Sequence, residues 1–419
     1  MALDIDALRR DTPGCNGNLT HLNNAGASLM PRPALSALLG HIELESRIGG
    51  YEAAIVNSRS IEHFYDALAA LLKGRPQEVA FLDSATRAWH VAFHAMDWQQ
   101  GDVVLTARSE YNANMVSFLH ARARHGIEFK LVPDTADGVI DVDALEAMVC
   151  SKTRLISLSH MPTNDGLINP VEQVGRIARA YGIPFLLDAC QSVGQMPLDV
   201  KEIGCTMLSA TGRKYLRGPR GTGFLWVDSD WIGKLVPYAL DIRSANWASA
   251  SSYEIAGDAR RFELWETNIA GQIALGEAAR YATDIGVTTM WSRIQSLATA
   301  LRHMIEALDG FTVHDQGTLR SGIVTFSHRT LSTADIVETL RRDHAINTSV
   351  SACQLTRAAL IASGVTHMVR ASIHAYNTIQ ELEALVEALG AMARRRHSGS
   401  PKANKNNDEP QEPSLGVEQ

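Results

Sequence analysis

An acidic residue and a lysine follow two successive strand-like runs near the middle of the chain. In residues 185–227, FLLDACQSVGQMPLDVKEIGCTMLSATGRKYLRGPRGTGFLWV, one apolar run ends in Asp188 and a second leads to Lys214 in a Gly-rich turn. Gln191 lies one helical turn after the aspartate. An aldehyde cofactor with a protonatable ring nitrogen requires an amine to form a Schiff base and a buried anion to hold the ring proton. The spacing therefore predicts a pyridoxal phosphate enzyme.

The residues around the lysine are consistent with that role. Arg213 and Arg217 flank Lys214, and burial beside cationic groups lowers the pKa of a lysine enough to make its neutral amine available. Asp188 would keep the ring nitrogen protonated, and Gln191 would reach the ring hydroxyl from the same side. The alternative is that Asp188 caps a helix and Lys214 is a surface lysine. Because both residues stand at consecutive strand ends, the cofactor interpretation is favoured.

A second motif could bind the phosphate of such a cofactor. In residues 81–93, FLDSATRAWHVAF, a strand-like run precedes small polar residues and a helix expected to begin near Ala88. Backbone N–H groups at a helix N-terminus bind anions, although ordinary capping of the helix explains the same residues. The candidate phosphate-binding residues here are Ser84, Ala85 and Thr86. Thr211 and Arg213, close to the lysine, would add two further donors.

The chain between these motifs predicts a mostly parallel sheet covered by helices on both faces. From about residue 51 to residue 207, strand-like runs such as VVLTA at 103–107 alternate with amphipathic helical segments, including 114–124 and 171–181. That alternation is typical of α/β proteins. The motifs described above would then lie at the carboxyl ends of neighbouring strands.

A smaller α+β unit is expected to follow. A long helical region at 269–308 leads into strand-like runs and two further helices, at 333–343 and 379–393. The expected division of the chain is an N-terminal segment that contributes to the small domain and the active site, a large cofactor-binding domain, a small C-terminal domain and a disordered tail. The corresponding boundaries are 1–50, 51–268, 269–395 and 396–419.

Length and composition agree with a two-domain enzyme. A chain of 419 residues exceeds what one hydrophobic core usually organises. A hydrophobic content of 45% and a charged content of 20% are ordinary for a globular protein, and the net charge of -7 argues against nucleic acid as the main partner. The N-terminal segment lacks the apolar core of a signal peptide, and no apolar run is long enough to cross a membrane.

The five cysteines show no CxxC pair and no short metal-ligand spacing. Neither a disulfide framework nor a metal site is therefore expected. Reduced thiols favour a cytoplasmic protein.

From HLNNAGAS at 21–28 to VRASIHAYNT at 369–378, the sequence resembles the class V aminotransferase superfamily of fold type I. That group contains cysteine desulfurases, selenocysteine lyases, kynureninase-like enzymes and isopenicillin N epimerase. The resemblance implies a Schiff base at Lys214, a ring-nitrogen partner at Asp188 and a ring-hydroxyl partner at Gln191. It also implies that Thr211 and Arg213 occupy two phosphate positions.

The resemblance assigns further residues to the site. Tyr111, in SEYNAN, occupies the position of the aromatic or imidazole group that stacks on the cofactor ring. Arg370 matches the arginine that pairs with the substrate carboxylate, although a surface ion pair is the alternative for this residue alone. Asn24 is expected to line the substrate pocket, and Thr163 to contact cofactor or substrate.

Two segments depart from the desulfurase pattern. RFELWETN at 261–268 places Glu266 where desulfurases carry a phosphate-binding threonine from the partner subunit, and Thr267 one residue later. INTSVSAC at 346–353 replaces the loop that carries the desulfurase cysteine, which leaves Cys353 open as a catalytic thiol or a small buried residue. Both segments look more like hercynylcysteine sulfoxide lyases and isopenicillin N epimerase-like proteins.

These resemblances favour cleavage of a carbon–sulfur bond in a cysteine-derived amino acid. Transamination and epimerisation of an amino acid are the alternatives within the same superfamily. A non-catalytic pyridoxal-binding regulator is disfavoured because no DNA-binding extension precedes Tyr51. The family also implies a homodimer that acts on a small amino-acid substrate, with the site near the interface.

Overall fold

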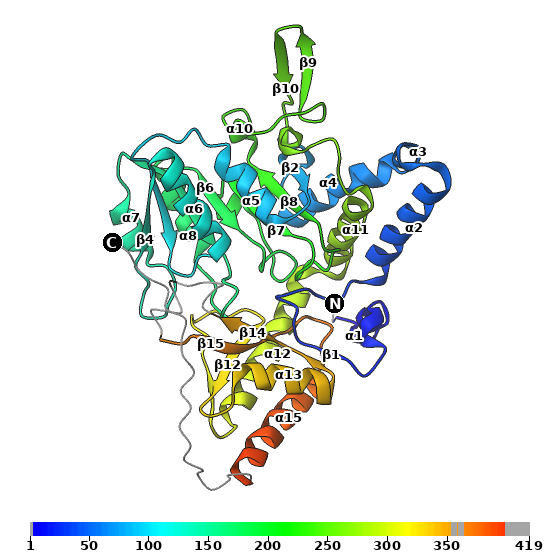
Figure 1. The fold of residues 1–419 in the computed structure, drawn as a ribbon, viewed down its shortest axis with the longest axis vertical. Helices are drawn as coiled ribbons and strands as arrows, with labels where there is room; N and C mark the ends of the chain where they lie inside the picture. Colours follow the sequence, from blue (N-terminus) through cyan, green and yellow to red (C-terminus); the bar gives the residue numbers. More distant parts are fainter. Residues whose placement is uncertain (1–2, 353–357, 359–363, 399–419) are drawn as a thin grey trace, which may run out of the picture.

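The computed structural model of the 419-residue chain describes residues 3–352, 358 and 364–398 (Figure 1). Cys353 and nearly all of the tail predicted to be disordered therefore lie outside the described residues. In the part that is described, no helix combines the length and apolar character needed to cross a membrane.

The largest sheet among the described residues contains seven strands in the order β2-β8-β7-β6-β5-β3-β4. Its strands are β2 (Val79–Leu82), β3 (Val103–Ala107), β4 (Glu128–Val132), β5 (Thr153–Ser159), β6 (Phe185–Asp188), β7 (Met207–Thr211) and β8 (Gly223–Val227). Strand β8 pairs antiparallel with both of its neighbours, β2 and β7, whereas the other pairs in this sheet are parallel. The carboxyl ends of β5, β6 and β7 consequently meet at one edge of the sheet.

Side chains from alternate positions of each strand enter different cores, as the pleat of a strand requires. On one face, Leu186 packs in a cluster with Trp89 of α5 (Ala85–His94) and Phe118 of α6 (Asn112–His125). On the other, Leu187 packs in a cluster with residues of α4 (Ser58–Leu72), α8 (Val171–Ala180) and α11 (Ile269–Ile285). The short helices of this part of the chain are α7 (Val142–Met148), α9 (Val200–Ile203) and α10 (Ser229–Ile232). The helices therefore cover both faces of the sheet, as the sequence predicts (Figure 1).

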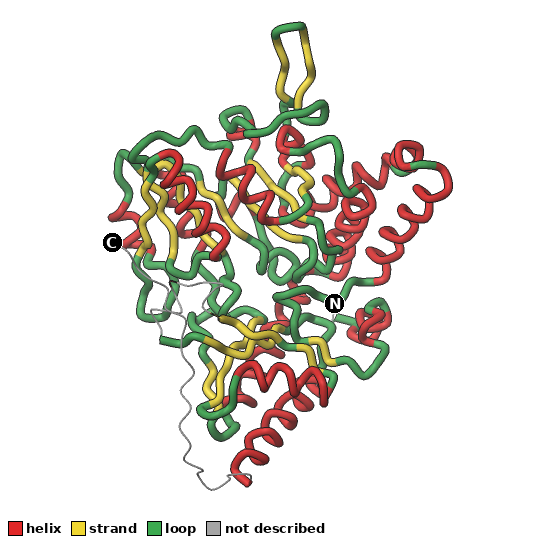
Figure 2. Tube along the Cα trace, in the orientation of Figure 1, coloured by secondary structure: helices red, strands yellow, loops and turns green. Residues whose placement is uncertain are grey.

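The smaller sheet is antiparallel, with strand order β11-β12-β15-β14. Its strands are β11 (Phe311–Val313), β12 (Ile323–His328), β14 (Ser349–Ala352) and β15 (His367–Ser372). Helices α12 (Val287–Glu306), α13 (Thr333–His344) and α15 (Ile379–Ser398) pack with it. Loops and turns fill the region between the two sheets (Figure 2).

The N-terminal segment adds to this smaller unit. It contains α1 (Ile5–Arg10) and β1 (Thr20–His21), and β1 pairs in parallel with β13 (Ile346–Asn347). Three short 3-10 helices are also present in the described part of the chain, at Pro13–Cys15, Pro76–Glu78 and Ala259–Phe262. The domain boundaries given above stay a prediction.

The predicted helical region at 269–308 is divided into α11 and α12, because Gly286 adopts φ of 92° between them, a conformation that favours glycine. The predicted start of another helix is wrong. Helix α5 begins at Ala85 and not near Ala88, because the Ser84 hydroxyl accepts a hydrogen bond from the backbone N–H of Arg87 and caps it.

A hairpin projects from the large unit, formed by β9 (Ala245–Ser249) and β10 (Ser252–Ile255) (Figures 1 and 2). Helices α2 (Arg32–Ile48) and α3 (Gly50–Val56) form a second projection (Figure 1).

Candidate active site

A cavity lies at the edge of the large sheet where strands β2, β5, β6 and β7 end. It brings together residues that are far apart in the sequence. The predicted cofactor residues that line it are Ser84, Ala85, Thr86, Tyr111, Thr163, Asp188, Gln191, Thr211, Arg213 and Lys214. The edge of the sheet therefore gathers the side chains that the sequence singles out, at the place where α/β sheets usually bind ligands.

Asp188, the last residue of β6, presents a buried carboxylate to this cavity. Its Oδ1 accepts a hydrogen bond from the backbone N–H of Cys190 at 3.0 Å, and its Oδ2 accepts one from Asn114 Nδ2 at 3.2 Å. Both donors are neutral, so these two hydrogen bonds pair the carboxyl group with no cation, and a cationic group of a bound molecule can still contact it.

Lys214 follows β7 and lies on the wall of the same cavity. Burial is the main cause that lowers the pKa of its amine below the ordinary value, and the positive charges of Arg213 and Arg370 act in the same direction. Arg217, predicted to contribute, packs elsewhere: its guanidinium lies 4.8 Å from the centre of the Tyr376 ring. Of the two arginines predicted to act on the amine, Arg213 lowers its pKa, whereas Arg370 takes the place assigned to Arg217; the charge of Asp188 acts in the opposite direction.

The phosphate-binding motif lies at the N-terminus of α5. The Ser84 hydroxyl caps the helix, as the alternative interpretation of the motif expected. The backbone N–H groups of Ala85 and Thr86 have no acceptor within the first turn of the helix and border the cavity. Gly223 keeps this wall open, because a Cβ at that position would lie 2.6 Å from the Ala85 nitrogen. The wall can therefore present its amides to an anion.

Gln191 can offer a hydrogen-bond acceptor to a ligand that carries a hydroxyl group. Its Nε2 donates hydrogen bonds to the Ala25 carbonyl and to Thr163 Oγ1, each at 3.1 Å. Its Oε1 is buried without a hydrogen-bond partner, although the residue lines the cavity. Buried acceptors are normally paired, so Oε1 offers an acceptor to a bound molecule. Together with the lysine, the aspartate and the helix N-terminus, this orphaned atom shows that the cavity fits pyridoxal phosphate.

Arg370 reaches the site from β15 of the smaller sheet. Its Nη1 donates to the Thr163 carbonyl at 2.9 Å and to Thr163 Oγ1 at 2.6 Å, and its Nε donates to Ser349 Oγ at 3.1 Å. Burial lowers the pKa of its guanidinium to about 10, which still leaves it charged at neutral pH. Within the described residues, Nη2 makes no hydrogen bond. This group is available to a substrate carboxylate.

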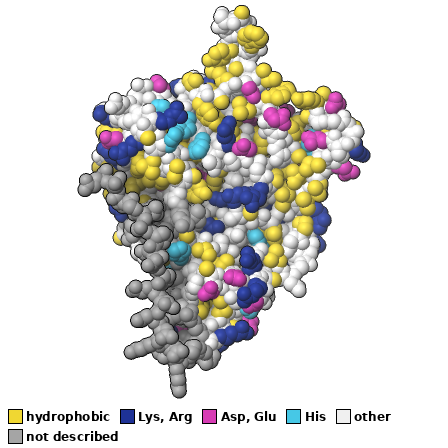
Figure 3. All heavy atoms as spheres, in the orientation of Figure 1, with side chains coloured by type: hydrophobic (Ala, Val, Ile, Leu, Met, Phe, Trp, Pro, Cys, Tyr) yellow, Lys and Arg dark blue, Asp and Glu magenta, His cyan; other side chains and the backbone are white. Residues whose placement is uncertain are grey.

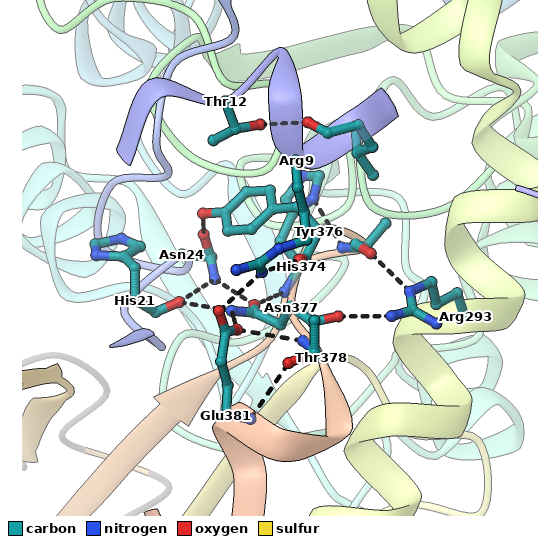
Figure 4. A network of polar contacts seen from close by, with 12 residues as sticks. Arg9, Thr12, His21, Asn24, Arg293, His374, Tyr376, Asn377, Thr378 and Glu381 are labelled. Atoms are coloured by element: carbon teal, nitrogen blue, oxygen red, sulfur yellow. Dashed lines mark hydrogen bonds and ion pairs between the residues drawn. The ribbon is translucent and has the colours of Figure 1, made fainter. Parts of the chain in front are cut away.

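Asn24 does not line the cavity. Its amide donates to the Ser372 carbonyl at 2.7 Å and accepts from the Tyr376 hydroxyl, so its hydrogen-bonding groups are used within the protein (Figure 4). The neighbouring Ala25 contributes the carbonyl that holds Gln191. The N-terminal segment therefore supports the wall of the site rather than entering it.

Sequence reasoning missed several residues of this region, and three of them contact the site through polar groups. Asn114 and Cys190 line the cavity, and Glu110 lies behind it as a fully buried carboxyl group. Glu110 lies just before the N-cap of α6 and Asn114 lies in its first turn, so the acid and the amide of SEYNAN are close in sequence. Cys190 had a usable signal, because it lies between Asp188 and Gln191.

Of the two segments that depart from the desulfurase pattern, the structure describes one completely. Cys353 lies outside the described residues. Glu266 and Thr267 border a separate cavity together with Tyr51, Ile55 and Trp265, and not the cavity that contains Lys214.

Comparison with known proteins agrees with this geometry. The model of the family described as Aminotransferase class-V matches residues 20–385. A protein named probable cysteine desulfurase from Methanothermobacter thermautotrophicus is 28% identical over 393 residues, which cover 92% of this chain and 97% of that protein. Another protein of the same name, from Halobacterium salinarum, is 28% identical over 406 residues, which cover 92% of this chain and 96% of that protein.

Solved structures show the same fold. The apo structure of a cysteine desulfurase from Thermococcus onnurineus NA1 superposes with a TM-score of 0.86 at 22% identity, covering 94% of this chain and 99% of that one. The complex between the cystine C–S lyase C-DES and its reaction product, cysteine persulfide, superposes with a TM-score of 0.81 at 23% identity. The superposition covers 90% of this chain and 99% of that one. The predicted fold class, a large domain with a mostly parallel sheet and a smaller α+β domain, is confirmed.

Proposed function

The chain belongs to the class V aminotransferase family, a family of pyridoxal phosphate enzymes, and we propose that it cleaves a carbon–sulfur bond in a cysteine-derived amino acid. The observation that carries the proposal is the cavity in which Lys214, Asp188 and the N-terminus of α5 meet. The choice of a sulfur-containing substrate is supported by the relatives, which are named as cysteine desulfurases, and by the likeness to a cystine C–S lyase.

When bound, pyridoxal phosphate supplies an aldehyde that condenses with amines and a protonated ring that withdraws electrons from the substrate Cα. Asp188 would hold the proton on the ring nitrogen, and Gln191 Oε1 would meet the ring hydroxyl. The Ala85 and Thr86 amides, with Thr211 and Arg213, would bind the phosphate, and Tyr111 would cover the ring face. All of these residues line the one cavity.

Two side chains would act on the substrate. Arg370 Nη2 would bind the substrate carboxylate, while Nε and Nη1 are held by Ser349 and Thr163 and fix the plane of the guanidinium. Lys214 carries an amine whose pKa is lowered by burial. In its neutral form it would attach the cofactor and, once displaced by the substrate, would take a proton from Cα.

The reaction can be identified by its products. Purified holoenzyme is incubated with cystine, with cysteine conjugates and their sulfoxides, and separately with D and L amino acids plus a keto acid. Pyruvate and ammonia, or alanine with released sulfur, support carbon–sulfur cleavage. A new amino acid from the keto acid would replace the proposal with transamination, and loss of optical purity without bond cleavage would replace it with epimerisation. A Lys214→Ala variant provides the background rate.

We further propose a homodimer. Large apolar side chains are exposed on α3, on the hairpin and in the loop before α11: Tyr51 at 70%, Ile55 at 74%, Val56 at 64%, Trp247 at 79% and Trp265 at 50%. Figure 3 shows hydrophobic side chains on the projecting hairpin and on the adjacent upper part of the molecule. Tyr51, Ile55 and Trp265 also line the cavity of about 650 Å³ that contains Glu266 and Thr267. Exposed apolar groups on this scale are typical of interaction surfaces.

Ile55→Asp tests the homodimer by placing a charge in that surface. Light scattering after size-exclusion chromatography should give a dimer mass for the wild type and a monomer mass for this variant. Leu119→Asp is the matched control, because Leu119 is 52% exposed on α6 and lies outside this surface. A wild-type monomer, or dissociation by both variants, would contradict the proposed interface.

A cytoplasmic location remains part of the proposal. The described cysteines Cys15, Cys150, Cys190 and Cys205 are free thiols, which agrees with a reducing compartment.

A further inference from the structure

Behind the cavity, the buried carboxyl group of Glu110 contacts four groups from three segments of the chain, the start of α6, β5 and β3. Its Oε1 accepts hydrogen bonds from the Tyr111 backbone N–H at 2.8 Å, from Asn114 Nδ2 at 2.9 Å and from the Ser159 hydroxyl. Its Oε2 lies 3.3 Å from Thr106 Oγ1. Glu110 is only 1% exposed. It is therefore a fixed anchor for groups that themselves border the cavity.

Asn114 connects this anchor to Asp188. One hydrogen of its Nδ2 goes to Glu110 Oε1, and the same nitrogen donates to Asp188 Oδ2 at 3.2 Å. An amide oxygen in that place would face two carboxyl oxygens, so the orientation of the Asn114 amide is fixed by its neighbours. Two buried carboxyl groups thus share a single neutral amide.

We propose that Glu110 is a positioning residue that locks Asn114 against Asp188 and so aims the Asp188 carboxylate at the ring nitrogen of the cofactor. The inference rests on the proposed function only in that the cavity must hold pyridoxal phosphate. It adds a residue that does not itself line the cavity and that reaches the cofactor through another side chain.

The contacts indicate that Glu110 does this as a neutral acid. Within the described part of the chain, no Lys, Arg or His side chain forms an ion pair or hydrogen bond with it, and Asp188 is the charged group that faces it. Burial, followed by the charge of Asp188, raises the pKa of Glu110, and the hydrogen bonds from Ser159, Asn114 and Tyr111 oppose this rise only in part. The three donors all point to Oε1, which suits a carbonyl oxygen. The partner of Oε2 is the Thr106 hydroxyl, which donates to it at 3.3 Å and, as a hydroxyl, can accept from it when the acid is protonated.

The test uses holoenzyme carrying pyridoxal phosphate labelled with a nitrogen isotope in its ring. NMR of that nitrogen reports whether it is protonated, a property that loss of fold stability alone does not change. Glu110→Leu removes both oxygens and leaves three donors without acceptors. We expect the ring nitrogen to lose protonation at neutral pH, and cofactor binding to weaken about tenfold or more.

Glu110→Gln keeps the carbonyl acceptor and replaces the acidic O–H with an N–H donor. We expect its ring-nitrogen signal to match the wild type and its cofactor affinity to stay within about twofold. If this variant behaves like Glu110→Leu, the neutral-acid account is overturned. Should Glu110→Leu fail to fold, Asn114→Ala removes the same link to Asp188 and must reduce ring protonation, or the proposal is overturned.

Glu78→Gln is the matched control for loss of a buried acid. Glu78 is fully buried but lies before β2, away from the edge that forms the cavity, and accepts a hydrogen bond from Trp226 Nε1. The ring-nitrogen signal of the Glu78→Gln holoenzyme should equal that of the wild type. If the wild type binds the cofactor and Glu110→Leu shows the same ring-nitrogen signal as the wild type, this inference is overturned and the proposed function is not. A wild type that binds no cofactor would overturn the proposed function, and this inference with it.

Discussion

Two buried polar networks of this molecule differ in how completely their groups are paired. The first joins the N-terminal segment to the C-terminal part of the chain (Figure 4). There, Arg9 Nη1 donates to Glu381 Oε1 and to the Tyr376 carbonyl, both at 2.8 Å. Asn377 Nδ2 donates to Glu381 Oε2 at 2.8 Å, and its Oδ1 accepts from the His374 backbone at the same distance.

The second network is the cavity, and it is incomplete. Gln191 Oε1 has no partner, and the Lys214 amine makes no ion pair with the carboxylates among the described residues. Buried polar groups are costly unless they are paired. A complete network therefore acts as a structural joint, whereas an incomplete one marks the place where a ligand provides the missing partners. The predictions below separate these two roles.

The largest effect is expected for Lys214→Ala. Loss of the amine removes covalent attachment of the cofactor, and activity should fall by about 1000-fold or more because nucleophile and base are lost together. The absorption spectrum of reconstituted protein measures attachment, and circular dichroism confirms the fold. Lys234→Ala, at an exposed position, is the control. An unchanged spectrum in Lys214→Ala would contradict the assignment.

Asp188→Asn should have the next largest effect. The variant keeps the size of the side chain and should still bind the cofactor, but a neutral amide cannot hold the ring proton. Loss of a charged hydrogen bond worth about 3 kcal/mol corresponds to roughly 100-fold lower kcat/KM. Steady-state kinetics beside an Asp66→Asn control, on the exposed face of α4, measures it. Wild-type rates in Asp188→Asn would count against the role of the carboxylate.

Asn377→Leu tests the structural joint. The residue is 1% exposed, and its removal leaves the His374 N–H without the Asn377 acceptor and takes one donor away from Glu381 Oε2. We expect a loss of about 2 kcal/mol in the free energy of unfolding, with an unchanged cofactor spectrum. Thermal denaturation beside Asn18→Leu, an exposed position of the N-terminal segment, measures this loss. A normal melting temperature with an altered spectrum would reverse the roles assigned to the two networks.

The smallest effect is a shift in a pH profile. Because burial lowers the pKa of Lys214, its neutral amine predominates at a lower pH than that of free lysine. The rate at which apoprotein captures pyridoxal phosphate should rise with pH and level off above the pKa of Lys214. The reference is the same reaction of a lysine derivative in solution. A capture rate that continues to rise in parallel with the free amine would show that the lysine is not perturbed.

Much of the fold was predictable because it depends on local patterns. Alternating apolar runs predicted the parallel sheet, and strand ends predicted where Asp188 and Lys214 meet. The break at Gly286 was not predicted, because the apolar pattern continues on both sides of a single glycine. The antiparallel direction of β8 depends on the tight Gly-rich turn after Lys214 and on strand pairing, neither of which periodicity reports.

The site was predictable where a residue follows a strand and less so where it depends on contacts across the fold. The link from Asn114 to Asp188 spans 74 residues and requires α6 to pack over β6, so the sequence does not display it. In the same way, Arg370 enters the environment of Lys214 only through the smaller sheet. Asn24 has a suitable residue type for a substrate pocket, but its amide faces Tyr376.

Borohydride reduction of the wild-type protein, after incubation with pyridoxal phosphate, tests the central claim most directly. Reduction fixes any cofactor that is bound through an amine, and peptide mass spectrometry then identifies the modified lysine. The account predicts one labelled peptide, with the added mass on Lys214. A label on a different lysine, or no label at all, would contradict it.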